Sequence, residues 1–186
     1  MKVQIKQAVL ELVDGDITKQ DTDAIVNAAN SSLLGGGGVD GAIHRAGGPQ
    51  ILAESRKLGG CETGDAKITT GGKLQARYVI HTVGPVYWRE GAERSAELLS
   101  SAYRRSLALA TEHGIQSIAF PSTGTGAYGF PIDEAAPIAL QTIIDYLRAE
   151  EECGITSVRF VLYGRQAYQV YQRTLMKLSD QGHLEG

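Results

Sequence analysis

Two glycine-rich segments stand out in this chain, and each has side chains beside it that could do chemistry. The first is Gly35–Gly38, with Asn30 before it and Asp40 after it. The second is Gly124–Gly129, which carries the hydroxyl of Thr125. Without a Cβ, consecutive backbone N–H groups can turn toward one anion. A helix that begins directly after such a loop adds free N–H groups and its dipole. The two segments therefore predict a site that holds a diphosphate from both sides.

Alternative interpretations of these loops are either less favoured than a diphosphate site or excluded. A tight connection is the ordinary explanation of a single glycine turn. Four consecutive glycines, at roughly 0.5–1 kcal/mol each relative to alanine in regular structure, favour unusual dihedral angles or close approach of a ligand. Both loops match Gly-x-Gly-x-x-Gly, but neither has the strand, helix and distant acid of a dinucleotide fingerprint around it. A P-loop is excluded, because the sequence contains no Gly-Lys-Ser/Thr.

Carboxylates and amides lie close to the first glycine loop in the sequence. Asp40 and His44 are spaced to project from one face of a helix, and Asn30 closes the other side of the loop. Asp40 could simply complement the helix dipole, but beside Asn30 and the glycines a role at the ligand is favoured. His44 is more typical of a packing or surface residue. Asp16, at a turn, is by default a capping residue, although its carboxylate could also accept a hydrogen bond from an adenine amine.

No motif in the sequence indicates a covalent nucleophile or a metal site. Cys61 and Cys153 have no His/Asp arrangement nearby, and no Gly-x-Ser-x-Gly elbow occurs. The remaining histidines lack ligand spacing: His81, His113 and His183. If the protein is a hydrolase, we expect water to be the nucleophile, positioned by Asn30 and polarised by a carboxylate or by a phosphate of the substrate.

Composition limits the partners. Lys plus Arg number 18 against 21 for Asp plus Glu, a net charge of −3, so no broad basic face for a nucleic-acid duplex is expected. The content of 42% hydrophobic and 21% charged residues is typical of a soluble globular protein. Two distant cysteines suit a reducing cytosol, and no segment approaches the roughly 18–20 apolar residues of a membrane span. We expect a cytoplasmic protein, and a monomer because no exposed apolar stripe is evident.

Strand-like and helix-like segments alternate along the chain. The strands are predicted at 23–30, 67–70, 77–83, 117–120 and 158–163, after a hairpin or one bent strand over 3–13. Helices are predicted at 39–46, 49–58, 92–113, 133–148 and 167–178. This alternation predicts an α/β layered domain with a sheet that is at least partly parallel, and ligands beyond the carboxyl ends of its strands. No linker or repeat divides residues 1–186, so we expect a single domain with a frayed tail at 179–186.

Four blocks of sequence resemble the macrodomain family in order and spacing, and the likeness covers nearly the whole chain. They are Gly15–Thr18, Asp23–His44, Tyr78–Pro85 and Gly124–Gly129. Within the family the chain is similar to the MacroD-type branch, which includes bacterial O-acetyl-ADP-ribose deacetylases and mono-ADP-ribosyl hydrolases. The resemblance implies a three-layer α/β/α fold with a mixed, mostly parallel sheet of about six strands and ADP-ribose in a cleft at its crest.

The resemblance also implies roles for individual residues. Asp16 would bind the adenine amine beside the backbone of Ile17, and Tyr163 falls where an aromatic ring often packs near the adenosine. Asn30 and Asp40 would serve the distal ribose and catalysis, with Asp40 either a base or a residue that orients a water activated by the substrate phosphate. The other binding residues implied are Asn27, Gly37, Gly38, Val39, His44, Gly124, Thr125, Gly126, Ala127 and Tyr128. The polar pair Ser122-Thr123 departs mildly from the family pattern.

The function that the resemblance implies is hydrolysis of an ester at the distal ribose by an activated water, without a metal or cofactor. The substrate would be O-acetyl-ADP-ribose or a protein mono-ADP-ribosylated on Asp or Glu. Two alternatives are a non-catalytic ADP-ribose reader and an ADP-ribose 1''-phosphate phosphatase. The presence of both Asn30 and Asp40 favours an enzyme, and the sequence does not rank the substrates. Nucleic acid would enter the same cleft only through an ADP-ribosylated end.

Overall fold

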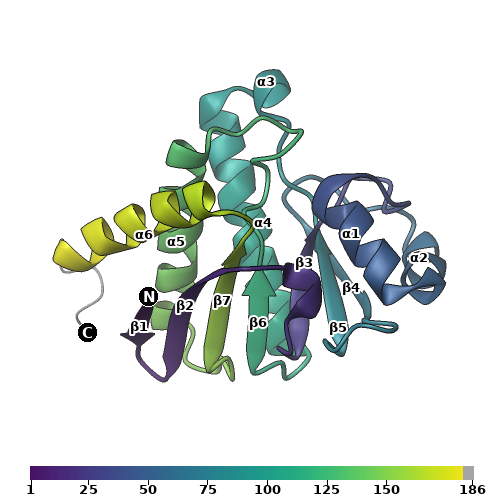
Figure 1. The fold of residues 1–186 in the computed structure, drawn as a ribbon, viewed down its shortest axis with the longest axis horizontal. Helices are drawn as coiled ribbons and strands as arrows, with labels where there is room; N and C mark the ends of the chain where they lie inside the picture. The colour runs from purple at the N-terminus through teal and green to yellow at the C-terminus, as the bar shows by residue number, and fades with distance from the viewer. Residues whose placement is uncertain (182–186) are drawn as a thin grey trace.

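A computed structural model describes residues 1–181, in which one mixed sheet carries helices on both faces (Figure 1). The seven strands follow the order β1-β2-β7-β6-β3-β5-β4. Their bounds are β1 Lys2–Ile5, β2 Ala8–Asp14, β3 Ala24–Ala28, β4 Ala66–Thr70, β5 Tyr78–Thr82, β6 Ser117–Phe120 and β7 Ser157–Leu162. Only the edge pairs β1·β2 and β4·β5 are antiparallel. The predicted class is confirmed, with seven strands instead of about six because the first segment forms a hairpin.

The helices agree with the periodic segments of the sequence. They are α1 Gly38–Gly47, α2 Pro49–Arg56, α3 Tyr87–Glu90, α4 Ala92–Glu112, α5 Ile132–Ala149, α6 Arg165–Asp180 and the 3₁₀ helix η1 Ile17–Lys19. Sequence reasoning missed α3 and η1, because three or four residues are too few to show a helical period. Helix α6 continues to Asp180, so the predicted frayed tail does not begin at residue 179; residues 182–186 lie outside the described part of the chain. Within residues 1–181, none of the helices has the length and apolar character needed to cross a membrane.

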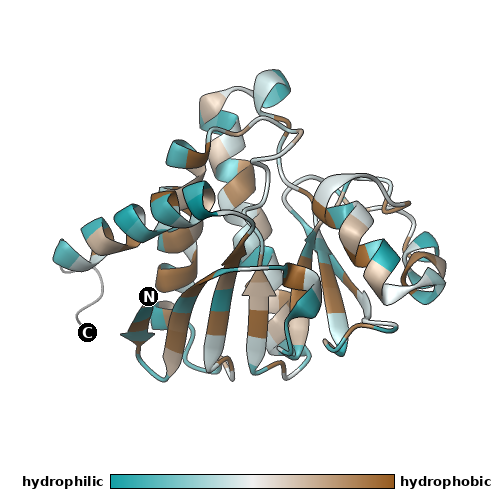
Figure 2. Cartoon of the chain, in the orientation of Figure 1, coloured by the Kyte–Doolittle hydropathy of each residue, from teal (hydrophilic) through white to brown (hydrophobic). Residues whose placement is uncertain are grey.

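The central strands are buried on both faces, which explains their continuous apolar runs. Ile25 of β3 packs in one cluster with Ile43 of α1 and Ile51 of α2. Its neighbour Val26 faces the opposite side, in a larger cluster with α4, α5 and α6. Figure 2 shows the hydrophobic residues concentrated in the strands, whereas α6 is largely hydrophilic on the side in view. The sheet thus packs between two layers of helices, which fix the positions of the carboxyl ends of its strands.

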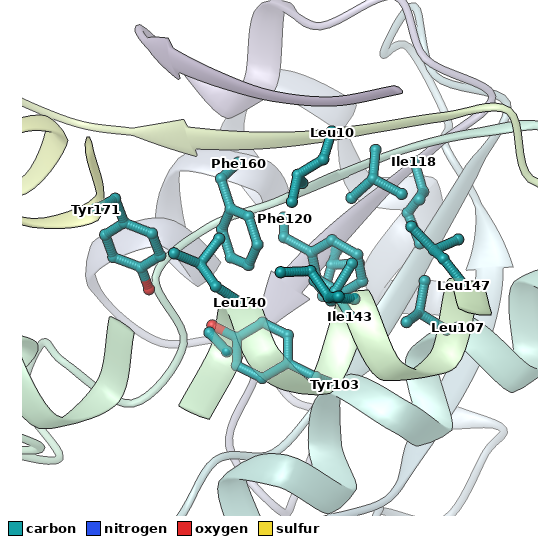
Figure 3. Packing of buried hydrophobic residues seen from close by; sticks show 14 of the residues in the cluster. Leu10, Tyr103, Leu107, Ile118, Phe120, Leu140, Ile143, Leu147, Phe160 and Tyr171 are labelled. Atoms are coloured by element: carbon teal, nitrogen blue, oxygen red, sulfur yellow. The ribbon is translucent and has the colours of Figure 1, made fainter. Parts of the chain in front are cut away.

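The larger cluster also anchors the loop that follows β6. The rings of Tyr103 and Phe120 lie 5.4 Å apart, close to Tyr171 (Figure 3). The Tyr103 hydroxyl accepts a hydrogen bond of 3.0 Å from the Thr123 backbone N–H, and the Tyr171 hydroxyl lies 2.8 Å from Ser122 Oγ. Burial raises the pKa of both tyrosines, so both hydroxyls stay protonated. The Ser122 hydroxyl and the Thr123 backbone are therefore held by tyrosines of the core.

Candidate active site

The two glycine loops meet at one cleft, above the carboxyl ends of the neighbouring parallel strands β3 and β6. The cleft has a volume of about 290 Å³. Its lining consists of residues from both loops and the strand ends below them: Ala28, Ala29, Asn30, Gly36, Gly37, Gly38, Val39, Asp40, Gly84, Ser122, Thr123, Gly124, Gly126, Ala127 and Tyr128. This is the position where parallel α/β sheets collect ligands. A larger groove of about 970 Å³ between α4 and α5 contains none of the predicted site residues.

Helix α1 begins at the cleft with its N-terminus open. Its N-cap is Gly37, which provides no side chain to accept from the free N–H groups. The backbone N–H of Gly41 makes the first bond back to the N-cap, 3.2 Å from Gly37 O. The N–H groups of residues 38–40 therefore have no acceptor within the helix. Gly38 and Val39 line the cleft, so these donors and the helix dipole are available to an anion there.

Glycine is required where α1 packs against its own loop. A Cβ on Gly41 would lie 2.7 Å from the carbonyl oxygen of Gly36, closer than real Cβ contacts allow. A Cβ on Gly36 would lie between two functional groups, 3.1 Å from Asp40 Oδ2 and 3.3 Å from Asn30 Nδ2. The absence of a side chain at Gly36 thus keeps open a space that both groups border.

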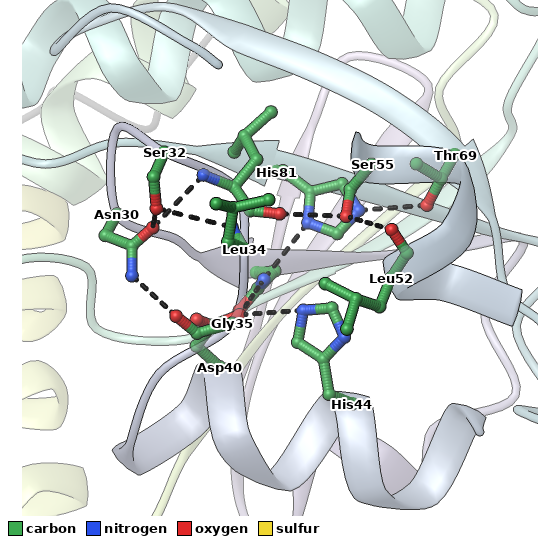
Figure 4. Close-up of polar contacts among 12 residues, drawn as sticks. Asn30, Ser32, Leu34, Gly35, Asp40, His44, Leu52, Ser55, Thr69 and His81 are labelled. Carbon is green, nitrogen blue, oxygen red and sulfur yellow. Dashed lines mark hydrogen bonds and ion pairs between the residues drawn. The ribbon is translucent and has the colours of Figure 1, made fainter. Parts of the chain in front are cut away.

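Asp40 does not cap the helix but lines the cleft and is only 5% exposed. Figure 4 shows its contact with His44. Its Oδ1 accepts a hydrogen bond of 2.7 Å from Asn27 Nδ2 and lies 3.2 Å from His44 Nε2. Its Oδ2 receives no hydrogen bond from the described residues and borders the space over Gly36. One oxygen is therefore fixed by the protein, and the other remains available to a ligand or a water. The predicted neighbour His44 is a partner of this carboxylate.

A buried histidine that the sequence reasoning left aside completes this arrangement. His81 Nδ1 lies 3.0 Å from Asn27 Nδ2, and His81 Nε2 lies 2.9 Å from Thr69 Oγ1. The Thr69 hydroxyl donates to the carbonyl of Thr70, so it accepts from Nε2–H of His81. Burial lowers the pKa of His81 to about 4, which keeps the ring neutral near pH 7. Asn27 then donates one amide hydrogen to His81 and the other to Asp40.

Asn30 shapes the glycine loop from within. Its Nδ2 donates to the carbonyl of Gly35 at 2.7 Å. Its Oδ1 accepts from the Ser32 hydroxyl at 2.7 Å and from the Leu33 N–H at 3.1 Å. The side chain is thus fixed by three hydrogen bonds, with its amide nitrogen beside the space over Gly36. The second hydrogen on Nδ2 is free for a ligand.

Comparison with known proteins identifies the fold family. Residues 26–139 match the family model described as "Macro domain". The chain belongs to the macrodomain family. A macro domain-containing protein of Caldanaerobacter subterraneus subsp. tengcongensis is 54% identical over 173 residues, 91% of this chain and 97% of that protein. The ADP-ribose glycohydrolase MACROD2 of Xenopus laevis is 50% identical over 177 residues, 94% of this chain and 42% of MACROD2. This likeness confirms the MacroD-type resemblance.

Solved macrodomain structures support the same assignment. The Oceanobacillus iheyensis macrodomain with ADP superposes with a TM-score of 0.92 at 46% identity, covering 97% of each chain. The Trypanosoma brucei macrodomain in complex with ADP-ribose superposes with a TM-score of 0.83 at 41% identity, covering 89% of this chain and 68% of that one.

Apart from Thr125, the predicted site residues of this macrodomain fall into three groups. The cleft itself is lined by Asn30, Gly37, Gly38, Val39, Asp40, Gly124, Gly126, Ala127 and Tyr128. Asn27 and His44 support it through Asp40. Thr125 belongs to the second loop, where its hydroxyl donates to the carbonyl of Ser122 at 3.0 Å. The third group, Asp16, Ile17 and Tyr163, lies outside the cleft, just beyond the paired strand ends Asp14 and Leu162.

The third group has its own polar contact. Asp16 Oδ1 accepts from the Thr18 N–H at 2.9 Å and from the Thr18 hydroxyl at 2.7 Å, which caps η1 as the sequence predicted. The hydroxyl of Thr18 lowers the pKa of Asp16, so this side chain is a carboxylate at neutral pH. Its Oδ2 receives no hydrogen bond from residues 1–181. The Ile17 side chain is buried in the smaller core cluster, and Tyr163 is 89% exposed.

Proposed function

We propose that this macrodomain binds ADP-ribose along the crest of its sheet and hydrolyses an ester at the distal ribose. The proposal is supported by relatives whose names or structures carry that ligand. MACROD2 of Xenopus laevis is described as an ADP-ribose glycohydrolase, and the Trypanosoma brucei macrodomain was solved with ADP-ribose. It is supported independently by the polar groups that this chain places along its cleft.

The diphosphate is held between the open N-terminus of α1 and the second glycine loop. Backbone N–H groups suit this task in a chain of net charge −3, because they supply local positive potential without lysine or arginine. The adenine lies at the β2 and β7 ends, where Asp16 Oδ2 accepts from its amine and Tyr163 packs against the adenosine. The distal ribose then reaches Asn30 and Asp40 at the other end of the cleft.

Ester hydrolysis requires a water oxygen to form a bond with the carbonyl carbon while the bond from that carbon to the ribose oxygen breaks. The ribose oxygen leaves with a proton, and the acid is released as a carboxylate. The proton lost by the water has two acceptors in such a complex, Asp40 Oδ2 and a phosphate oxygen of the substrate. In either case Asp40 fixes the water, because its Oδ1 is already committed to Asn27 and His44.

The observation that carries the proposal is the free Asp40 Oδ2 facing Asn30 Nδ2 across the space over Gly36. A site that only bound the diphosphate would need the backbone donors and would not need a buried carboxylate at its end. Because this carboxylate lies at the ribose end and is not among the donors that hold the diphosphate, its presence favours catalysis over simple recognition.

A paired measurement on the purified protein without added metal tests the proposal. Calorimetry measures the binding of ADP-ribose, and a second assay measures acetate release from O-acetyl-ADP-ribose. We expect binding together with acetate release, and loss of the release in Asp40→Ala. Binding without release of acetate, or of ADP-ribose from a modified protein, would assign the protein to the readers. Release of phosphate from ADP-ribose 1''-phosphate instead would identify a phosphatase, and absence of ADP-ribose binding would refute the whole proposal.

A further inference from the structure

A second hollow, of about 310 Å³, adjoins the cleft and shares three of its lining residues, Gly84, Ala127 and Tyr128. We call it the side hollow. The rest of its lining is Ser31, Thr63, Val83, Val86, Trp88 and Arg89. Because the two hollows share these lining residues, they lie side by side on the protein surface.

The sheet order shows at which end of the cleft the side hollow lies. Along the crest the strands follow β2-β7-β6-β3-β5, so β5 flanks β3 on the side away from β2 and β7. Val83 and Gly84 follow β5 directly, and Ser31 follows Asn30. Asp16 and Tyr163 follow β2 and β7. The side hollow is therefore at the Asn30 end of the cleft, opposite the end proposed for adenine.

Helix α3 forms one wall of the side hollow and is firmly attached. The Tyr87 N–H donates to the carbonyl of Tyr128 at 2.9 Å, and the Tyr87 hydroxyl donates to Glu134 at 2.8 Å. The Tyr87 ring packs on Phe130 with centroids 4.9 Å apart. Figure 1 shows α3 at the top of the molecule, above the sheet. These contacts hold the start of α3, the helix that carries Trp88.

Trp88 and Arg89 present an aromatic and a cationic surface to solvent. Trp88 is 71% exposed, although a ring of this size is usually buried or used in an interface. The Arg89 guanidinium lies over the Trp88 ring, 5.3 Å from its centroid, and has no acidic partner among residues 1–181. Arg89 is the one formally charged residue among the described residues that line the side hollow, so a carboxylate bound there would find a cationic partner.

We propose that the side hollow binds the polypeptide on either side of an ADP-ribosylated Asp or Glu, with a preference for acidic sequences. The inference rests on the proposed function, since it places the group attached to the distal ribose. Chain atoms of the peptide pack on Trp88, and a neighbouring carboxylate of the peptide pairs with Arg89. An acetyl ester ends at a methyl group and is too short to use this surface. The side hollow would therefore distinguish a modified protein from the acetyl ester.

Trp88 is the single tryptophan of the chain, so its fluorescence reports directly on a molecule bound in the side hollow. The probe is an acidic peptide mono-ADP-ribosylated on one glutamate, titrated into Asp40→Ala so that it is not cleaved. We expect a blue shift of Trp88 emission with this peptide and none with ADP-ribose alone. We also expect the peptide to bind about tenfold more tightly than ADP-ribose, the contribution of one interface hot spot. Equal affinity and unchanged emission would overturn the inference.

Comparing the turnover of two substrates distinguishes the role of the side hollow from that of the cleft. In otherwise unchanged enzyme, Trp88→Ala and Arg89→Glu should each lower kcat/KM for the modified peptide about tenfold and leave acetate release from O-acetyl-ADP-ribose within about twofold. Matched controls far from the crest are Met176→Ala, which removes another exposed apolar side chain, and Arg104→Glu, which reverses another exposed charge. Both controls should leave both rates unchanged.

The outcomes distinguish this inference from the proposed function. Equal loss on both substrates, or no loss on either, would refute a peptide site in the side hollow while the hydrolase proposal stands. No turnover of either substrate by the unmodified enzyme, with no binding of ADP-ribose, would refute the proposed function and this inference with it.

Discussion

Asn27 of β3 donates a hydrogen bond of 2.7 Å to Oδ1 of Asp40 in α1, so the sheet and the helix are joined at the wall of the cleft. The same nitrogen contacts His81, so both its hydrogens are used. A buried carboxylate is costly unless it is well hydrogen-bonded, and this contact meets part of that cost. It also selects which Asp40 oxygen faces the cleft. The orientation of the Asp40 carboxylate thus depends on a strand residue that does not itself line the cleft.

Replacing Asp40 by alanine removes the free oxygen at the Asn30 end of the cleft. We expect acetate release from O-acetyl-ADP-ribose to fall at least about 100-fold, the usual contribution of a positioned base or water-binding group. ADP-ribose affinity should change little, because the backbone donors of both glycine loops remain. Steady-state assays and calorimetry measure the two quantities, with Asp145→Ala, at an exposed position of α5, as the control. An unchanged rate would remove Asp40 from the mechanism.

Gly36→Ala tests the space between the two site residues. The new methyl group would lie 3.1 Å from Asp40 Oδ2 and 3.3 Å from Asn30 Nδ2, within the volume proposed for the water and ribose. Because Gly36 does not have a positive φ, alanine fits the backbone there, and we expect a folded protein with turnover reduced more than about tenfold.

A matched substitution is Gly154→Ala, where a methyl group meets open space far from the cleft. It should leave both turnover and the melting temperature unchanged. Full activity in Gly36→Ala would show that the reaction takes place elsewhere in the cleft.

Much of this architecture could be predicted from local sequence. Helices α4 and α5 show their apolar period, and β3 has the continuous apolar run of a strand covered on both faces. The glycine loop and Asp40 are adjacent in the chain, so their proximity needed no knowledge of the fold. The hairpin could not be told from one bent strand, because its turn is short and the sequence shows apolar residues on both sides of it.

The supporting residues were missed because they come together only through strand pairing. His81 lies opposite Asn27 in the β3·β5 register, and Thr69 is on β4, the other neighbour of β5. In the sequence, no other potential metal ligand stands at a characteristic spacing from His81, so a search for metal-binding motifs does not select it. One signal was present in the sequence, since a histidine within the apolar strand 77–83 must find a buried polar partner. Which partner it finds depends on register, which the sequence alone did not specify.

His81 makes stability depend on pH. The folded protein protonates this ring only near pH 4, whereas the unfolded chain does so near 6.5. Between these values the unfolded state binds more protons, so acidification favours unfolding. The contribution of His81 to the free energy of unfolding is complete above about pH 6.5 and is lost progressively as the pH falls to about 4. At 1.36 kcal/mol per unit of pKa shift, the loss is about 3 kcal/mol.

Denaturant unfolding across this pH range measures the effect. His81→Gln should flatten the pH dependence and lower kcat more than it raises KM, because Asn27 loses a fixed partner while the ligand donors remain. His113→Gln, at an exposed position, should keep the wild-type slope. An unchanged slope in His81→Gln would show that another group titrates.

Asp16 should recognise the exocyclic amine of adenine through its free Oδ2. Wild-type protein should therefore bind ADP-ribose about tenfold more tightly than the analogue with hypoxanthine, which has a carbonyl in place of the amine, because a hydrogen bond to a charged group contributes about 1.5 kcal/mol or more. Asp16→Ala should bind both nucleotides equally and weakly. It should also lose about 1 kcal/mol of stability, because η1 loses the acceptor for the Thr18 N–H. Calorimetry with both nucleotides on wild-type protein and on Asp16→Ala measures the four affinities. A preference for ADP-ribose that survives in Asp16→Ala would place the adenine amine against a different residue.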